Sequence, residues 1–147
     1  MDRSLHITWY DLAEADRAAH LQWLHGSFIP RQLKKPGVLW AAHYEVDKKP
    51  TPPRVKHTSD PAVGNGNDYI LIFGAESTHA FARDAASFYK GSVDRFAAQQ
   101  SAEDKAMLVK RTGVRVAIMS EEARVFGNES GRREGRRLPA PCIQLGS

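Results

Sequence analysis

Cysteine is nearly absent from this chain, since Cys142 is the single one among 147 residues. One cysteine excludes an internal disulfide and a thiolate metal cluster within one chain. No run approaches the roughly 18 consecutive apolar residues that a membrane-spanning helix needs. The first residues, MDRSLHITWYD, lack the apolar stretch of a secretory signal. These absences predict a cytoplasmic protein without a membrane partner.

Catalytic and metal-binding motifs are also scarce. The Gly-rich stretch GNGN at 64–67 precedes an expected strand and not a helix, so it predicts a turn and no phosphate-binding loop. No serine or cysteine occupies a recognisable nucleophile elbow. His20 and His25 are separated by about 140° around a helix axis. His57 and His79 have no carboxylate at ligand spacing. The sequence therefore predicts neither a metal nor another cofactor.

Basic charge is concentrated in one short segment. The net charge is +4, and residues 130–137, SGRREGRR, carry +3 of it. A nucleic-acid-binding protein usually spreads Lys and Arg over a folded face or along one helix. We interpret the segment as a solvated connector, with a phosphate-binding arm as the weaker alternative. The pattern argues against nucleic acid as the main partner.

Length and composition indicate one globular domain. The hydrophobic fraction is 41% and the charged fraction 26%, both ordinary for a globular protein. A chain of 147 residues builds one core but not two. We place this domain at 1–129 and a basic extension at 130–147. A short edge strand expected at 142–145 gives the extension a means of exchanging a strand with a partner.

Hydrophobic periodicity predicts four strands and three helical segments. We expect strands at 5–10, 38–46, 68–75 and 113–120. We expect helices over 14–33, from Ser77 along the stripe of Phe81, Phe88 and Phe96, and over 101–110. In the second strand, Val38, Trp40, Ala42, Tyr44 and Val46 should form one face and Leu39, Ala41, His43 and Glu45 the other.

Caps and breakers support the helical segments. Glu14 and Asp16 stand in the first turn of the first helix, where the macrodipole favours acidic residues. Ser101, with Asp104 three residues later, should begin the third. Residues 48–67 hold four of the eight prolines and no periodicity. We expect a long loop there, which is typical of a functional or mobile segment.

The order β-α-β-β-α-β predicts an α+β, ferredoxin-like fold with a four-stranded antiparallel sheet. Helices on one face leave the other face uncovered, carrying either the Trp40 and Tyr44 set or the His43 and Leu39 set. An uncovered apolar face needs a partner. A symmetric homodimer is the usual solution.

Residues 23–44 resemble the dimeric α/β-barrel superfamily and, within it, the EthD-like group. The resemblance is carried by Trp23, Pro30, Pro36-Gly37 and the His43-Tyr44 pair. Residues 68–77, DYILIFGAES, are similar to the family's third strand, and 141–146, PCIQLG, to a segment that closes over the partner. The resemblance implies a dimeric barrel with a cleft for a small molecule.

The chain departs from that pattern at one position. Many EthD-like members carry a histidine two residues before the proline, where this chain has Phe28. His25 lies one helical turn earlier. The departure implies that acid–base chemistry of the relatives is either lost here or moved to other residues.

The remaining polar and aromatic candidates lie in the expected strands. We expect His6 and His43 to point away from the helices into the closed barrel, beside Tyr10 and Arg115. A buried histidine near Arg or Tyr suits acid–base work near neutral pH. A single structural hydrogen bond from each histidine is the alternative. The candidate catalytic residues are His43, His6 and Arg115. The candidate ligand-binding residues are Tyr10, Trp40, Tyr44, Tyr69 and Met119.

Two functional classes follow from the resemblance. One is a small-molecule enzyme, either a cofactor-independent oxygenase or an isomerase of a degradation pathway. It would act on a hydrophobic compound, aromatic ones included, in a dry cavity. The other is a non-catalytic barrel protein, which would bind a small ligand, be associated with a stress response, or serve as an accessory subunit of another enzyme. Replacing His43 and His6 with Gln distinguishes the two, because only the enzyme loses turnover.

Overall fold

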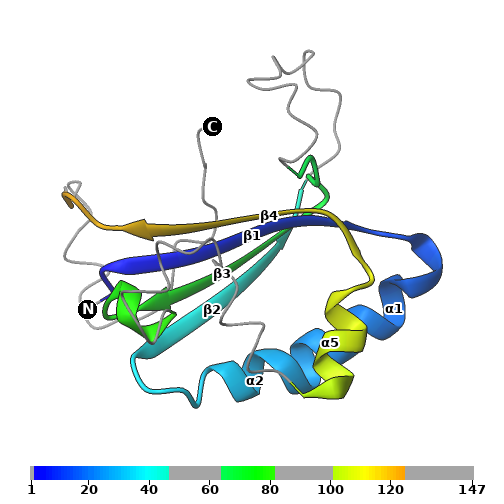
Figure 1. Ribbon diagram of the computed structural model, residues 1–147, viewed down its shortest axis with the longest axis horizontal. Helices are drawn as coiled ribbons and strands as arrows, with labels where there is room; N and C mark the ends of the chain where they lie inside the picture. Colours follow the sequence, from blue (N-terminus) through cyan, green and yellow to red (C-terminus); the bar gives the residue numbers. More distant parts are fainter. Residues whose placement is uncertain (1, 47–63, 82–100, 125–147) are drawn as a thin grey trace, which may run out of the picture.

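Four strands of the chain form one antiparallel sheet (Figure 1). The computed structural model describes residues 2–46, 64–81 and 101–124. The strands are β1 (Ser4–Leu12), β2 (Val38–Glu45), β3 (Tyr69–Ala75) and β4 (Arg111–Ser120). Their spatial order is β2-β3-β1-β4, and each neighbouring pair is antiparallel. The predicted α+β class and four-stranded antiparallel sheet are confirmed, and the arrangement is consistent with a ferredoxin-like fold.

The helices lie on one side of this sheet (Figure 1). The first predicted helix is a continuous run of α1 (Glu14–Trp23), a π-helical turn η1 (Leu24–Phe28) and α2 (Ile29–Gln32). The third is α5 (Ala102–Leu108). Of the second, only a 3₁₀ turn, η2 (Thr78–Ala80), is described. The rest of that helix, most of the 48–67 loop and the 130–147 extension lie outside the described residues.

The π-helical turn is explained by Pro30. Proline has no N–H to donate to the carbonyl of Gly26, and its ring would collide with that carbonyl in a regular helix. The helix widens instead, and the Ile29 N–H reaches the Leu24 carbonyl five residues back. The widened turn includes His25.

Helix α5 begins as expected and is fastened by a buried carboxylate. The Ser101 side chain accepts a hydrogen bond from the Asp104 N–H at 3.1 Å. Asp104 is buried, and its Oδ1 accepts hydrogen bonds from Trp23 Nε1 at 3.1 Å and from the Arg31 guanidinium. Burial acts to raise the pKa of Asp104, but hydrogen bonds with Arg31, Ser101 and Trp23 hold it below its usual value. The carboxylate thereby joins α5 to α1 and α2.

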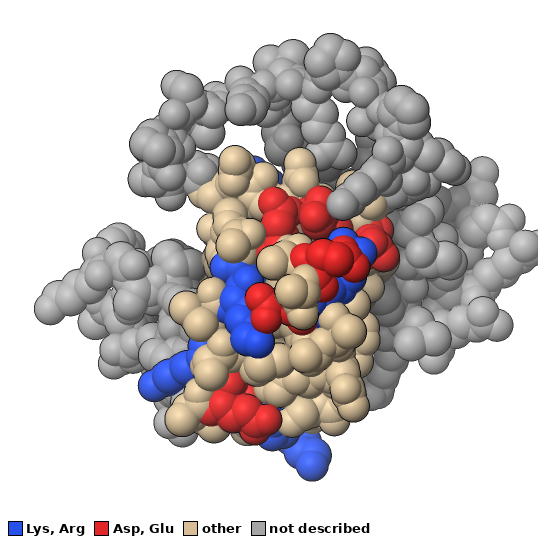
Figure 2. All heavy atoms as spheres, turned by 90° about the vertical axis from the view of Figure 1, so that its right-hand side faces the viewer, with Lys and Arg blue, Asp and Glu red and all other residues tan. Residues whose placement is uncertain are grey.

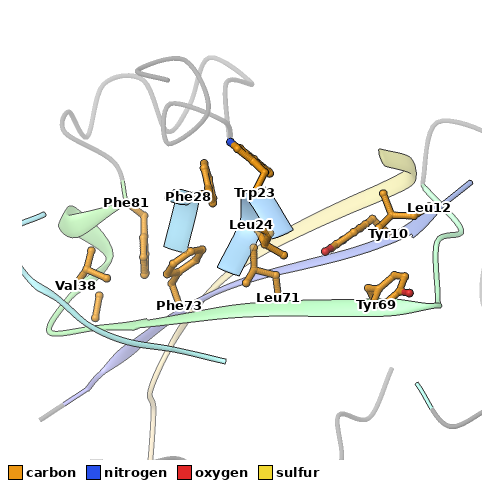
Figure 3. Close-up of a cluster of buried hydrophobic side chains, with 11 residues drawn as sticks. Tyr10, Leu12, Trp23, Leu24, Phe28, Val38, Tyr69, Leu71, Phe73 and Phe81 are labelled. Atoms are coloured by element: carbon orange, nitrogen blue, oxygen red, sulfur yellow. The ribbon is translucent and has the colours of Figure 1, made fainter. Parts of the chain in front are cut away.

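The hydrophobic core fills the space between the helices and one face of the sheet (Figure 3). Alternate residues of a strand share a face, so each strand sends every second side chain into this core. Tyr10 and Tyr69 lie together at one end of the cluster, and Val38 and Phe81 lie at the other (Figure 3). The core residues are Tyr10, Leu12, Trp23, Leu24, Phe28, Val38, Tyr69, Leu71, Phe73, Ala75 and Phe81.

The predicted faces of the second strand are wrong at its start. The pairing of β2 with β3 shifts between Val38 and Trp40, so Leu39 is an extra residue and the alternation reverses there. Val38 points into the core, whereas Trp40 lies over Gly74 on the opposite face. A Cβ on Gly74 would stand 2.2 Å from the Trp40 ring, so this packing requires glycine.

The segment 64–67 supports β1 from the edge of the sheet. The Gly66 N–H donates to the Gly113 carbonyl at 2.7 Å. A Cβ on Gly66 would stand 2.6 Å from Tyr10 Cα, so the segment lies directly against Tyr10. The pairing of β1 with β4 shifts at this point, between Trp9 and Asp11. The irregular segment therefore fits a bulge and continues into β3, and no turn is assigned to residues 64–67, where the sequence predicted one.

Candidate functional site

A hydrogen-bonded chain of three side chains crosses the helix-covered face of the sheet. Tyr10 Oη lies 2.8 Å from His43 Nε2, and His43 Nδ1 lies 2.9 Å from His25 Nε2. Tyr10 comes from β1, His43 from β2 and His25 from the π-helical turn. Each link joins residues that are far apart in the sequence, so the chain depends on the folded structure.

Aromatic rings stack around the middle of this chain. The His43 ring is stacked on Tyr69 with centroids 5.4 Å apart and on Tyr10 with centroids 6.0 Å apart. Tyr10 and Tyr69 are themselves stacked, with centroids 5.5 Å apart. His20 meets Tyr10 from α1 at 5.8 Å. Such offset contacts hold the imidazole of His43 in one orientation.

Two guanidinium groups lie over the tyrosines of the stack. The Arg111 guanidinium is 5.5 Å from the centroid of the Tyr10 ring, and that of Arg17 is 5.9 Å from the centroid of Tyr69. Both distances fall within the range of cation–π attraction. Arg17 also lies 3.4 Å from the exposed carboxylate of Glu14. The stack is therefore flanked by positive charge from α1 and from β4.

Burial increases along the chain from His25 to Tyr10. His25 is exposed, His43 is partly buried and Tyr10 is fully buried. Desolvation, and then the neighbouring His25 and His20, lower the pKa of His43 to about 4. Desolvation raises the pKa of Tyr10 well above its usual value, although Arg111 opposes the change. At neutral pH both groups are uncharged, so the bond between them is one between a phenol and a neutral imidazole.

His20 is a second neutral imidazole beside the stack. It is buried, and its pKa is lowered to about 4, first by desolvation and then by Arg111 and Lys110, against weaker opposing effects of the Met107 backbone and Asp16. His20 and His43 thus both pack on Tyr10, and His25 packs on His43. Among the described residues, no group of three or more His, Cys, Asp or Glu side chains could hold a metal ion.

The predicted site residues divide between the two faces of the sheet. Tyr10, His43 and Tyr69 meet on the helix-covered face, as the stack shows. His6 also lies on that face, where its ring packs on Phe81 with centroids 5.4 Å apart. Phe81 lies at the end of the core away from Tyr10 (Figure 3). The expectation that His6 and His43 point away from the helices is wrong. In β1 and β2, the positions of His6 and His43 alternate with residues whose side chains point to the face without helices.

Arg115, Trp40, Tyr44 and Met119 lie on the opposite face. Arg115 pairs with Trp9 in register, and its guanidinium stands 4.4 Å from the centroid of the Trp9 ring. The expectation that Arg115 shares a site with His43 is therefore wrong. Tyr44 pairs with Ile70, and Met119 with Leu5, at positions that alternate with the core residues.

His25 and His20 are the members of the cluster that sequence reasoning missed. Regular helical geometry places them about 140° apart, which separates them. The π-helical turn alters that geometry within the run that contains His25. The available signal was Pro30, because a proline inside a helical pattern disturbs the turn before it.

Charges of both signs are mixed over the end of the molecule that faces the viewer in Figure 2. Lys110 pairs with Asp16 at 2.9 Å, and Arg17 with Glu14 at 3.4 Å. The positive charges of Lys110 and Arg17 are thus each accompanied by a carboxylate. Within the described ranges, no helix is both long and apolar enough to cross a bilayer.

Comparison with solved structures gives a weak structural likeness. No protein-family model matches the chain, and no curated protein matches it significantly. The solved structure of a monooxygenase from the gene ActVA-Orf6 of Streptomyces coelicolor, in complex with the ligand nanaomycin D, aligns with a TM-score of 0.46 and 10% sequence identity. The alignment covers 86% of this chain and 94% of that chain. A likeness this distant carries no conclusion about activity.

Proposed function

We propose that this chain binds a small hydrophobic, aromatic molecule on the helix-covered side of the sheet and exchanges a proton with it. The observation that carries the proposal is the hydrogen-bonded chain Tyr10–His43–His25 inside an aromatic stack. Acid–base groups held in one orientation next to apolar surface are typical of small-molecule sites.

The neutral state of His43 and Tyr10 suits this role. With its pKa lowered to about 4, His43 is neutral at neutral pH and links Tyr10 to His25 through its two ring nitrogens. Tyr10 stays a phenol because desolvation raises its pKa. Removal of a proton from an activated C–H or O–H leaves an anion on the bound molecule. Return of the proton at another atom makes the protein an isomerase, and reaction of the anion with dioxygen makes it a cofactor-independent oxygenase.

The aromatic stack indicates the class of molecule. A planar ring placed beside His43 and Tyr69 gains stacking and apolar contact. The guanidinium groups of Arg17 and Arg111, close to the tyrosine rings, favour negative charge that develops on such a ring. Both contributions favour an aromatic compound that passes through an anionic state.

We also propose that the opposite face of the sheet is the contact between two copies of the chain, as in the EthD-like group that the sequence resembles. Trp9, Trp40 and Tyr44 are only partly buried on this face, and Met119 is 42% exposed. Partly exposed aromatic side chains on one sheet face favour a symmetric contact. Binding at the helix-covered face then leaves the dimer contact separate from the site.

Native mass spectrometry of the full chain tests the proposal. A mass near twice 16.4 kDa together with a copurifying aromatic compound supports it. The His43→Gln variant should then bind that compound but lose turnover, while His79→Gln, at an exposed turn, should retain both. Unchanged turnover in His43→Gln would show a non-catalytic binding protein. A chain that retains no compound and binds none from a panel of small aromatics contradicts the proposal.

A further inference from the structure

The buried hydroxyl of Tyr10 fixes the direction of the hydrogen-bonded chain. Tyr10 is fully buried, and within the described residues its Oη has one hydrogen-bond partner, His43 Nε2 at 2.8 Å. A buried O–H that lacks an acceptor is costly, so the hydroxyl donates and His43 Nε2 accepts. Neutral His43 has one ring hydrogen, which must then lie on Nδ1.

The same direction continues to His25. His43 Nδ1–H donates to His25 Nε2, 2.9 Å away, so a neutral His25 carries its hydrogen on the other nitrogen, Nδ1. An imidazolium has a hydrogen on Nδ1 as well, so this N–H is present in either charge state. His25 is exposed, and within the described ranges its Nδ1 makes no hydrogen bond. The chain therefore ends in an N–H that is open to a bound molecule.

We infer that His25 Nδ1–H is the hydrogen-bond donor that holds an oxygen atom of the bound aromatic molecule, with His43 and Tyr10 as positioning residues. The inference rests on the proposed function and narrows its ligands to aromatic compounds with an acceptor oxygen, such as ketones and phenolates. The rings of His25 and His43 meet edge to face with centroids 5.1 Å apart. A molecule that lies against this end of the stack presents its rim to His25, and ring oxygens are attached at the rim.

Each hydrogen bond of the chain strengthens the next donor. The Tyr10 O–H polarises His43, and the His43 N–H polarises His25, so the last N–H is a better donor than that of a lone imidazole. Negative charge that develops on the held oxygen makes this last bond charge-assisted and therefore stronger. The N–H thus stabilises the anion that the proposed reaction forms.

The opposite direction of the chain is the competing arrangement. His25 Nε2–H would then donate to His43 Nδ1, and His43 Nε2–H would donate to Tyr10 Oη. This arrangement leaves the Tyr10 hydrogen buried without an acceptor among the described residues. It also removes the hydrogen from Nδ1 of a neutral His25, so that the chain would end in an acceptor and select a ligand with a donor group.

Nitrogen-15 NMR of the histidine rings tests the direction on the full chain without any ligand. In neutral His43 and neutral His25 we expect the hydrogen on Nδ1, whereas exposed His79 should show the mixture of a free imidazole. Tyr10→Phe removes the O–H that fixes the direction, so His43 and His25 should become mixtures, a change that a purely structural contact does not require. Neutral His25 with its hydrogen on Nε2, or no change in Tyr10→Phe, would overturn the inference.

Two probes of the same shape test the acceptor oxygen. Acetophenone carries a ketone oxygen, and α-methylstyrene has a methylene group in its place. NMR titration of the full chain measures the affinity of each. His25→Phe keeps a ring but removes the N–H, so it should weaken acetophenone about three- to tenfold relative to α-methylstyrene, the range of one hydrogen bond. His79→Phe, at an exposed turn, is the control and should change neither affinity.

The pair of probes separates the inference from the proposed function. If the chain binds both probes and His25→Phe changes their affinities equally, aromatic binding remains and His25 is rejected as the group that holds the oxygen. If the chain binds neither, small aromatic molecules are not its ligands, and the inference falls with the proposed function. A selective loss of acetophenone binding in His25→Phe supports both.

Discussion

Tyr10 and His43 share a hydrogen bond of 2.8 Å although β3 separates their strands in the sheet. In register, Tyr10 pairs with Tyr69 of β3, and His43 pairs with Leu71 of the same strand. The two side chains therefore meet above β3, on the helix-covered face. Their bond links edge strand β2 to central strand β1 in addition to the backbone ladders.

Tyr10→Phe should destabilise the protein by about 1–3 kcal/mol, because it leaves a partly buried nitrogen of His43 without its partner. Chemical denaturation with urea measures the change in the free energy of unfolding. Tyr44→Phe is the matched control, since Tyr44 is also in a strand but lies on the opposite face. Equal effects of the two substitutions would show that the Tyr10–His43 bond contributes nothing specific.

Stability should decrease as the pH falls from about 6.5 to about 4. His43 and His20 have pKa values lowered to about 4 in the folded chain, against an ordinary value of 6.5. The unfolded chain therefore takes up protons over this window while the folded chain does not, so protonation favours unfolding. The slope is at most about 1.4 kcal/mol per pH unit for each histidine.

Urea denaturation at a series of pH values measures that slope. The slope reports how many more protons the unfolded chain binds than the folded chain. In the His43→Gln and His20→Gln variants this number should fall by up to one each, whereas His79→Gln should leave it unchanged. Because the readout is the slope and not the stability itself, a general loss of stability in either variant does not imitate the effect. A slope in this window that neither substitution reduces would contradict the lowered pKa values.

His25→Gln should raise the pKa of His43. Desolvation is the largest cause of the lowered pKa of His43, and the neighbouring His25 is the second. Removal of the second cause leaves the first, so the pKa should rise but stay below 6.5. Proton NMR of the His43 ring as a function of pH measures it, with His79→Gln as the control. A pKa of His43 that stays the same or falls would show that the two rings are not coupled.

Most of the fold could be predicted because its elements follow local patterns. The alternation around Ile7 and Trp9, the acidic first turn at Glu14 and the Ser101 cap each identify an element from a few adjacent residues. The reversal of the second strand could not be predicted this way. It depends on Trp40 lying over Gly74 of another strand, which is a contact between distant residues.

The candidate site could be predicted only in part. The sequence predicts Tyr10, His43 and Tyr69 as candidate site residues, and the structure stacks their rings together. The side of the sheet was assigned wrongly because alternation tells which residues share a face but not which face the helices cover. His25 was missed because its direction depends on the π-helical turn before Pro30.

Asp104→Asn should destabilise the chain by about 2–4 kcal/mol. The buried carboxylate accepts hydrogen bonds from Trp23 and Arg31, and an amide presents an N–H where these donors need an acceptor. The ion pair adds less than a buried pair would, since the Arg31 side chain is 42% exposed. Glu103→Gln, an exposed neighbour in the same turn, is the control. Near-equal unfolding midpoints in urea would show that Asp104 does not fasten α5.

Met119→Glu should convert a dimer into a monomer if the opposite face of the sheet is the contact between copies. Met119 is 42% exposed and pairs with Leu5 on that face, so a symmetric contact would bring two new carboxylates into an apolar interface. Leu33→Glu changes a side chain of similar exposure, 39%, just after α2 and away from this face, and should leave the dimer intact. Analytical ultracentrifugation at micromolar concentration distinguishes the two states. A wild-type monomer, or a dimer that Leu33→Glu dissociates and Met119→Glu does not, would move the contact to another surface.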